Sequence, residues 1–178
     1  MGLRGRTLLT DERCFFVTTT CHNHEHFLAD ETCFQILLDN FRFYNHKYDA
    51  RLVAYVLLNN HIHFIIYFEK DNQLSNYLRD FKKYTSIQIR QHLLAIYPEL
   101  ATRLVFEQKQ QFFKIWETRF DDVYLNTKEV CKTKIAYIHD NPVRAGLADD
   151  PTQYRFSSAA FYLTNNKQSS LLDYRNIF

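Results

Sequence analysis

The stretch RLVAYVLLNNHIHFIIYFE, residues 51–69, contains two apolar runs rich in branched and aromatic side chains, with Asn59 and Asn60 between them. Runs of this length and composition are typical of β-strands. Two turn-forming residues between such runs predict a tight hairpin, because asparagine tolerates a positive φ. We therefore expect strands over residues 51–59 and 61–69, joined by a short turn.

Two histidines stand where the chain enters the second of these strands. Residues two apart in a strand point to the same face, so His61 and His63 should project together, away from Ile62 and Phe64. Two neighbouring imidazoles can bind one divalent ion through neutral ring nitrogens. A chance pairing is the alternative, since the chain has eight histidines. Burial of two imidazoles without partners is costly, however, and this favours a role for the pair.

The segments around the hairpin alternate between strand and helix patterns. CFFVTTT (residues 14–20) indicates a strand, and the apolar spacing over residues 31–48 and 72–97 predicts two amphipathic helices. FFKIWETRF (residues 112–120) and a shorter run at 123–125 indicate further strands. The hairpin is thus expected between two helices, with strand segments before and after them.

A last helix is predicted from Asn126, where Glu129 three residues later would complete a capping box. It should end near Asn141, because Pro142 disfavours helical geometry in the residue before it. The order strand, helix, strand, strand, helix, strand, helix is that of a ferredoxin-like split βαβ domain with an added C-terminal helix. We predict an α+β fold with a central antiparallel sheet.

The composition is that of one globular domain, which we expect over residues 1–165, followed by a polar tail over residues 166–178. Hydrophobic residues make up 46% of the chain, and a net charge of +2 does not by itself indicate a nucleic-acid binder. The four cysteines show no CxxC spacing, and no apolar run approaches the roughly 20 residues of a membrane span. We expect a cytoplasmic protein with reduced, mostly buried cysteines and no membrane association.

A second histidine-rich run, CHNHEHF at residues 21–27, places His22, His24 and His26 at alternate positions. The run is polar throughout and follows the first strand. We interpret it as a solvated loop and not as a working metal site.

The other informative stretch is KIAYIHDNPVRAGL, residues 134–147, in which Tyr137 and Asn141 lie one helical turn apart. One interpretation makes Tyr137 a core aromatic and Asn141 the helix end. The other joins them to the histidine pair: a metal held by His61 and His63 needs a further oxygen ligand, which Asn141 could supply. The ion would polarise a phosphate oxygen, and Tyr137 could attack the phosphorus. A phenol with a pKa of about 10 needs such help to lose its proton.

Taken together, these motifs resemble the REP-associated tyrosine transposases, which are single-tyrosine HUH transposases. The resemblance rests on five segments: AYVLLNNHIHFII (54–66), LRDFKKYTS (78–86), KIWETRF (114–120), YIHDNPVRAGL (137–147) and YRFSSA (154–159).

The resemblance implies a site and a reaction. His61 and His63 would be metal ligands, Asn141 the third ligand, and Tyr137 the catalytic nucleophile. The tyrosine of this family joins the 5′ phosphate of cleaved single-stranded DNA, and a 3′ hydroxyl later rejoins the strand. The expected cofactor is Mg²⁺ or Mn²⁺, the expected partner is single-stranded or hairpin DNA, and the expected state is a monomer or a homodimer.

Basic and aromatic residues are candidates for holding that DNA. Three basic side chains near one face of the second helix are spaced to follow phosphates, and two aromatic ones could stack on bases. The candidates are Arg79, Lys82, Lys83, Tyr84 and Trp116, with Arg144 after the nucleophile. The alternative is a solvated helix face for the charges and a core position for the tryptophan.

Two other functions compete with strand transfer. A domesticated relative would bind structured single-stranded DNA or RNA without cutting it. A metal-dependent hydrolase would use Tyr137 only structurally.

Overall fold

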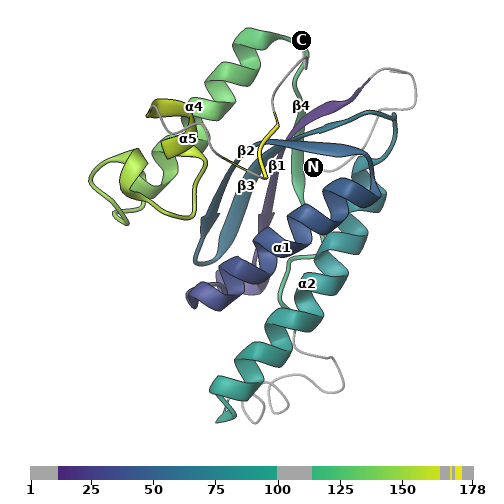
Figure 1. Cartoon of the computed structure of the whole chain (residues 1–178). Coiled ribbons are helices and arrows are strands. Elements are labelled where there is room, and N and C mark those ends of the chain that lie inside the picture. The colour runs from purple at the N-terminus through teal and green to yellow at the C-terminus, as the bar shows by residue number, and fades with distance from the viewer. Residues whose placement is uncertain (1–11, 100–113, 165–168, 170, 174–178) are drawn as a thin grey trace.

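The computed structural model describes residues 12–99, 114–164, 169 and 171–173. These residues form a four-stranded antiparallel sheet in the order β2-β3-β1-β4 (Figure 1). The strands are β1 (Cys14–Thr20), β2 (Ala50–Leu58), β3 (His61–Phe68) and β4 (Asp121–Tyr124). This order and the two helices that connect it confirm the predicted ferredoxin-like α+β fold.

The hairpin between β2 and β3 forms as predicted, but the reason given for its turn is wrong. Among the described residues, positive φ outside glycine occurs only at Asn23, His24, Asp49 and Asn72. Asn59 and Asn60 therefore do not use the left-handed region. Their carbonyl groups accept hydrogen bonds from Leu28 N (2.9 Å) and Cys21 N (2.7 Å), so tertiary contacts hold the turn.

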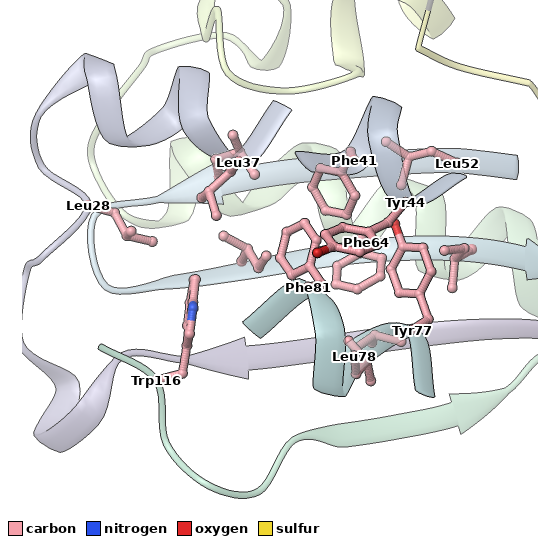
Figure 2. Close-up of a cluster of buried hydrophobic side chains, with 14 of the residues drawn as sticks. Leu28, Leu37, Phe41, Tyr44, Leu52, Phe64, Tyr77, Leu78, Phe81 and Trp116 are labelled. Atoms are coloured by element: carbon pink, nitrogen blue, oxygen red, sulfur yellow. The ribbon is translucent and has the colours of Figure 1, made fainter. Parts of the chain in front are cut away.

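One face of the sheet is covered by α1 (Glu31–Lys47) and α2 (Leu74–Ile96), whose predicted apolar stripes point inward (Figure 1). Figure 2 shows the aromatic side chains that fill this layer. The Phe41 ring lies 5.1 Å from that of Phe64 on β3 and 4.6 Å from that of Phe81 on α2, measured between centroids. Burial of such large side chains is the main stabilising term for this half of the fold.

The opposite face is covered by α4 (Lys128–Arg144), with α5 (Ala159–Leu163) and the short helix η2 (Pro151–Gln153) beside it (Figure 1). Its apolar cluster is smaller and includes Phe16, Val56, Ile65, Cys131 and Ile138. The sheet is thus buried on both faces, and the apolar layer under α1 and α2 is the larger of the two.

A strand was predicted over residues 112–120. Residues 114–120 do not form a strand, and residues 112 and 113 lie outside the described residues. Trp116 makes an isolated bridge to Cys21, and the strand at this edge is β4, a few residues later. The Trp116 side chain is buried, and its Nε1 donates to Thr85 Oγ1 at 2.9 Å. Anchoring of the indole in the core takes this segment away from the sheet edge.

Both predicted ends of α4 are displaced. The N-cap is Thr127 and not Asn126: its hydroxyl accepts a hydrogen bond from Val130 N at 3.2 Å. The helix also continues through Pro142 to Arg144. Pro142 is buried, and its packing outweighs the local preference against a helical residue before proline.

The four cysteines are all free and buried, as predicted. The described part of the C-terminal tail lies against β2, where Leu172 bridges to Leu52 and Asp173 N donates to Leu52 O at 2.9 Å. In the ranges that the structure describes, no helix combines the length and the apolar character needed to cross a membrane.

Candidate active site

The histidine pair projects from β3 toward α4, and the predicted division of the strand is confirmed. Ile62 and Phe64 belong to the cluster under α1 and α2, whereas His63 stacks on Phe16 of the opposite cluster at 5.6 Å. The His61 and His63 ring centroids lie 4.8 Å apart at an interplanar angle of 79°. The two imidazoles are therefore neighbours on one face, with ring planes nearly perpendicular.

Tyr137 of α4 lies against this pair. Its ring centroid is 5.5 Å from that of His63 and 5.9 Å from that of Phe16, both in edge-to-face geometry. The side chain is 37% exposed, so Tyr137 is not the fully buried core aromatic of the alternative interpretation. A strand and a helix far apart in sequence thus bring an imidazole pair and a phenol together.

Asn141 lies one turn further along α4, and its side chain turns back onto its own helix. Its Nδ2 donates to Tyr137 O at 2.6 Å. Among the described hydrogen bonds and ring contacts, none joins Asn141 to His61 or His63. The structure places Asn141 next to the nucleophile candidate without setting it against the histidines.

Each imidazole makes a hydrogen bond through its Nδ1 atom. His63 Nδ1 lies 2.8 Å from Thr18 Oγ1, and His61 Nδ1 lies 2.7 Å from Asn60 Oδ1. Sequence reasoning missed both partners. Asn60 could have been found as the residue before His61, whereas Thr18 needed the register of β1 against β3, which pairs it directly with His63.

Burial disfavours the charged form of both imidazoles. Burial, together with the nearby His61 and Lys134, lowers the pKa of His63 to about 3. Burial and the neighbouring His24 lower the pKa of His61 as well. Neutral imidazole is the form that ligates a metal, and a pair of them suits Mn²⁺ or a similar divalent ion. The residues present therefore fit the cofactor that the sequence predicts.

Two cations flank the Tyr137 ring. Lys134 Nζ lies 5.7 Å from its centroid and 4.7 Å from that of Phe16, and the Arg144 guanidinium carbon lies 5.6 Å from the Tyr137 centroid. Arg144 was a predicted DNA contact, and Lys134 was missed. Positive charge beside this phenol attracts phosphate.

Four of the other candidates for DNA contact lie on α2, across the sheet from Tyr137: Arg79, Lys82, Lys83 and Tyr84. Lys83 and Tyr84 are exposed, with Lys83 Nζ 5.5 Å from the Tyr84 ring centroid. Arg79 is exposed and pairs with Asp80 at 3.1 Å. Trp116 is buried, so the core alternative holds for it and base stacking does not.

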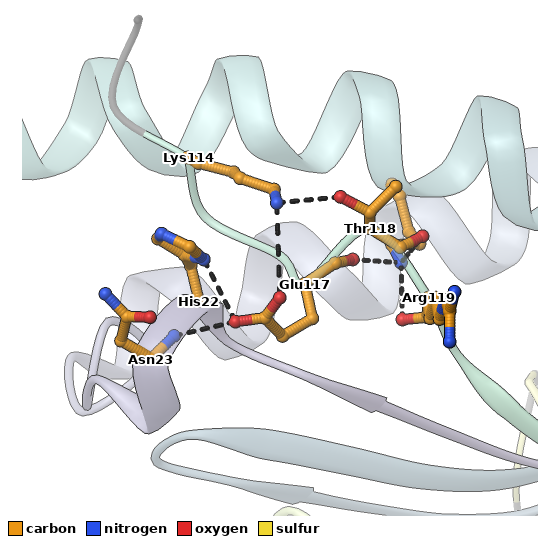
Figure 3. A network of polar contacts seen from close by, with 7 residues as sticks. His22, Asn23, Lys114, Glu117, Thr118 and Arg119 are labelled. Atoms are coloured by element: carbon orange, nitrogen blue, oxygen red, sulfur yellow. Dashed lines mark hydrogen bonds and ion pairs between the residues drawn. The ribbon is translucent and has the colours of Figure 1, made fainter. Parts of the chain in front are cut away.

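Lys82, also on α2, is occupied within the fold. Its Nζ donates to the carbonyl oxygens of Glu117 at 2.6 Å, Thr118 at 3.4 Å and Arg119 at 3.3 Å (Figure 3). Burial lowers its pKa to about 8, with Lys114 contributing. Lys82 thereby supports the segment before β4, and its predicted phosphate contact would compete with these bonds.

The histidine-rich run forms the short helix η1 (His22–His24) and an exposed continuation, in agreement with the predicted loop. The Glu117 carboxylate accepts hydrogen bonds from His22 Nδ1 and Asn23 N, each at 2.9 Å (Figure 3). These bonds attach the loop to the segment that Lys82 supports.

A second group of ligand-type side chains lies at the start of α1. Asp30, Cys33 and His92 bring ligand atoms within 4.8 Å of one another. Asp30 Oδ1, however, accepts from His92 Nε2 and Thr32 N, both at 2.8 Å, as the N-cap of α1. Helix capping and an ion pair account for this arrangement.

The fold of the whole chain is similar to that of a REP-associated tyrosine transposase solved bound to a REP hairpin, with a TM-score of 0.68 over 98% of this chain and 96% of that one, at 19% sequence identity. A crystal structure of a Deinococcus radiodurans protein described as a transposase gives a TM-score of 0.49 at 14% identity, over 77% of this chain and 95% of that one. No curated protein matches the chain.

The histidine pair and Tyr137 also fall within one stretch of family-level similarity. The sequence model of the IS200-like transposases matches residues 13–141, which run from β1 to Asn141. That span covers all four strands of the sheet, including the strand that carries the imidazoles, and α4 as far as Asn141. The chain belongs to the IS200-like transposase family.

Proposed function

We propose that this protein cleaves single-stranded DNA next to a hairpin and transfers the strand through a covalent bond to Tyr137. The phenolic oxygen attacks the phosphorus, the bond to the 3′ oxygen breaks, and that oxygen leaves as a 3′ hydroxyl after gaining a proton. Attack by another 3′ hydroxyl on the phosphotyrosine reverses the step and rejoins the strand. Membership of the transposase family supports DNA as the substrate, and the likeness to a protein bound to a REP hairpin supports the hairpin.

One observation carries the proposal: the Tyr137 ring lies 5.5 Å from the His63 ring. The phenol is partly exposed, so a phosphate can reach it, whereas His63 is 5% exposed. A purely structural tyrosine would have no need to pack against one of two adjacent imidazoles.

The roles divide between the strand and the helix. When bound, Mg²⁺ or Mn²⁺ would be held by His61 and His63, with Asn141 as the further ligand, and would supply a Lewis acid for a phosphate oxygen. Lys134 and Arg144 lie beside the Tyr137 ring and attract the phosphate. Phe16 packs edge-on against Tyr137 and restricts its ring.

The test uses a labelled DNA hairpin with a single-stranded extension, incubated with the protein and Mn²⁺. We expect a covalent protein–DNA adduct that resists denaturant and is abolished by Tyr137→Phe. The matched control is Tyr97→Phe, which changes a similarly exposed tyrosine (46%) at the end of α2 and should leave the adduct intact.

Each other outcome has its own meaning. An adduct that survives Tyr137→Phe shows that the nucleophile is another residue. Binding without an adduct favours the domesticated binder of structured DNA or RNA. Release of cleaved product without any adduct favours a metal-dependent hydrolase.

A further inference from the structure

The residue that orients His61 is the asparagine before it. Asn60 Oδ1 is a carbonyl-type oxygen and can only accept a hydrogen bond, so its 2.7 Å contact with His61 Nδ1 requires the proton to be on Nδ1. In a neutral imidazole the other nitrogen, Nε2, then carries the free lone pair. That lone pair is what a metal needs.

The orientation of the Asn60 amide is itself set by a second contact. Its Nδ2 lies 3.3 Å from His24 O, and a carbonyl oxygen can pair only with the amide NH₂. Rotation of the amide by 180° would bring the amide oxygen against the His24 carbonyl oxygen, so this contact selects the orientation that points Oδ1 at His61 Nδ1. The two contacts therefore agree on one orientation.

The His24 carbonyl is held in turn by the histidine-rich loop. Asn23 and His24 both have positive φ, at 54° and 58°, which turns the backbone at this point. Glu117 fixes the loop through Asn23 N and His22 Nδ1. The run of alternating histidines thus reaches the site through a backbone carbonyl and not through an imidazole.

We propose that Asn60, pinned by the His24 carbonyl, is a positioning residue that holds His61 in the Nδ1–H tautomer and so presents Nε2 to the metal. This rests on the proposed function for the identity of the metal site, but the tautomer is a property of the metal-free protein. A hydrogen-bond partner of this kind on a ligating histidine typically changes metal affinity by about 10- to 100-fold.

The test compares four proteins, Asn60→Ala, Asn60→Asp, Asn59→Ala and wild type, first without metal. Long-range ¹H–¹⁵N NMR correlations report which nitrogen of His61 is protonated. We expect the Nδ1–H form in the wild type, in Asn59→Ala and in Asn60→Asp, which keeps an acceptor oxygen. Asn60→Ala should give a mixture of tautomers. Asn59 is the matched control because it shares the turn, and neither residue needs a positive φ that alanine would resist.

The second measurement is Mn²⁺ affinity by calorimetry. We expect Asn60→Ala to bind Mn²⁺ about tenfold more weakly, with the Asn60→Asp and Asn59→Ala proteins within a few-fold of wild type. An Nε2–H tautomer in the wild type, or an unchanged tautomer and affinity in Asn60→Ala, would overturn the inference. If His61→Ala leaves Mn²⁺ affinity unchanged, the metal site fails, while the NMR result still decides whether Asn60 sets the tautomer.

Discussion

The two faces of the sheet differ in chemistry, although the same strand contributes residues to both. His63 and Phe64 are consecutive on β3, yet Phe64 enters the aromatic layer under α1 and α2 while His63 faces α4. The first face is closed by large apolar side chains. The second carries a smaller apolar cluster with histidines, a partly exposed tyrosine and two cations at its margin. We infer that the first face mainly specifies the fold, which allows the second to hold polar groups that cost stability.

The largest expected effect separates these roles at adjacent positions. Phe64→Ala should lower the free energy of unfolding by about 3–5 kcal/mol, because it removes a fully buried ring from a packed layer. His63→Gln should cost less than about 1.5 kcal/mol, since it removes one hydrogen bond, but should abolish the DNA adduct. Urea unfolding and the adduct assay measure the two effects. Equal destabilisation by both changes would contradict the division between the faces.

Acid should weaken the α4 face specifically. Burial lowers the pKa of His139 to about 4, and its Nε2 lies 2.9 Å from Ser158 Oγ. Below pH 6.5 this histidine is protonated in the unfolded chain but stays neutral in the folded protein. The free energy of unfolding therefore decreases as the pH falls from 6.5 toward 4. For this residue the loss should reach about 2.5 kcal/mol at pH 4.5.

The measurement is urea unfolding of the metal-free protein between pH 4.5 and pH 8. His139→Gln keeps a polar partner for Ser158 but cannot be protonated, so its stability should fall less steeply in this window. An identical pH dependence in the wild type and the variant would show that His139 is not the source of the loss.

A moderate effect is expected at Lys134. Removal of its charge in Lys134→Ala should slow adduct formation about tenfold, equivalent to about 1.4 kcal/mol, because the phosphate and the phenolate lose a nearby cation. Lys132→Ala, two residues earlier and exposed on the same helix, is the control. Single-turnover kinetics at fixed salt measure the rate. An equal change in both variants would indicate general charge attraction and not a specific role for Lys134.

The smallest effect is expected on the aromatic-core side. Lys83→Ala on α2 should weaken DNA binding by a few-fold at low salt, and the difference should shrink as salt is raised. The rate of adduct formation at saturating DNA should not change, because Lys83 lies across the sheet from Tyr137. Fluorescence anisotropy across a salt series measures the binding. A slower saturated rate would connect this face directly to the chemistry.

Periodicity was enough to predict most of the fold. The apolar spacing of α1 and α2, and the apolar runs rich in branched and aromatic side chains in β1, β2 and β3, come from side chains that face a core, and such patterns are visible in sequence. The conformation around Trp116 was predicted wrongly because a hydrogen bond to Thr85, far away in sequence, anchors the indole. The continuation of α4 past Pro142 was missed because burial of the proline outweighs the preference of the preceding residue for a non-helical backbone.

The site was predictable only in part. Alternation predicted that His61 and His63 share a face, and helical spacing predicted that Asn141 follows Tyr137 on α4. The contact between His63 and Tyr137 depends on how α4 crosses the sheet, which no local pattern encodes. Thr18 was missed because it reaches the site from the neighbouring strand β1. Lys134 lies three residues before Tyr137 on α4, so helical spacing could have found it.

The continuation of α4 through Pro142 places Arg144 on the same helix as Lys134 and Tyr137. Lys134, Tyr137 and Arg144 all belong to one continuous helix, whose ten-residue separation between the cations corresponds to roughly 15 Å along the axis. Tyr137 and the two cations are therefore carried by one helix, while the histidines belong to the sheet. A tilt of α4 against the sheet would move the phenol and the two cations together. The packing of α4 on the sheet would therefore set the distance between Tyr137 and the imidazoles.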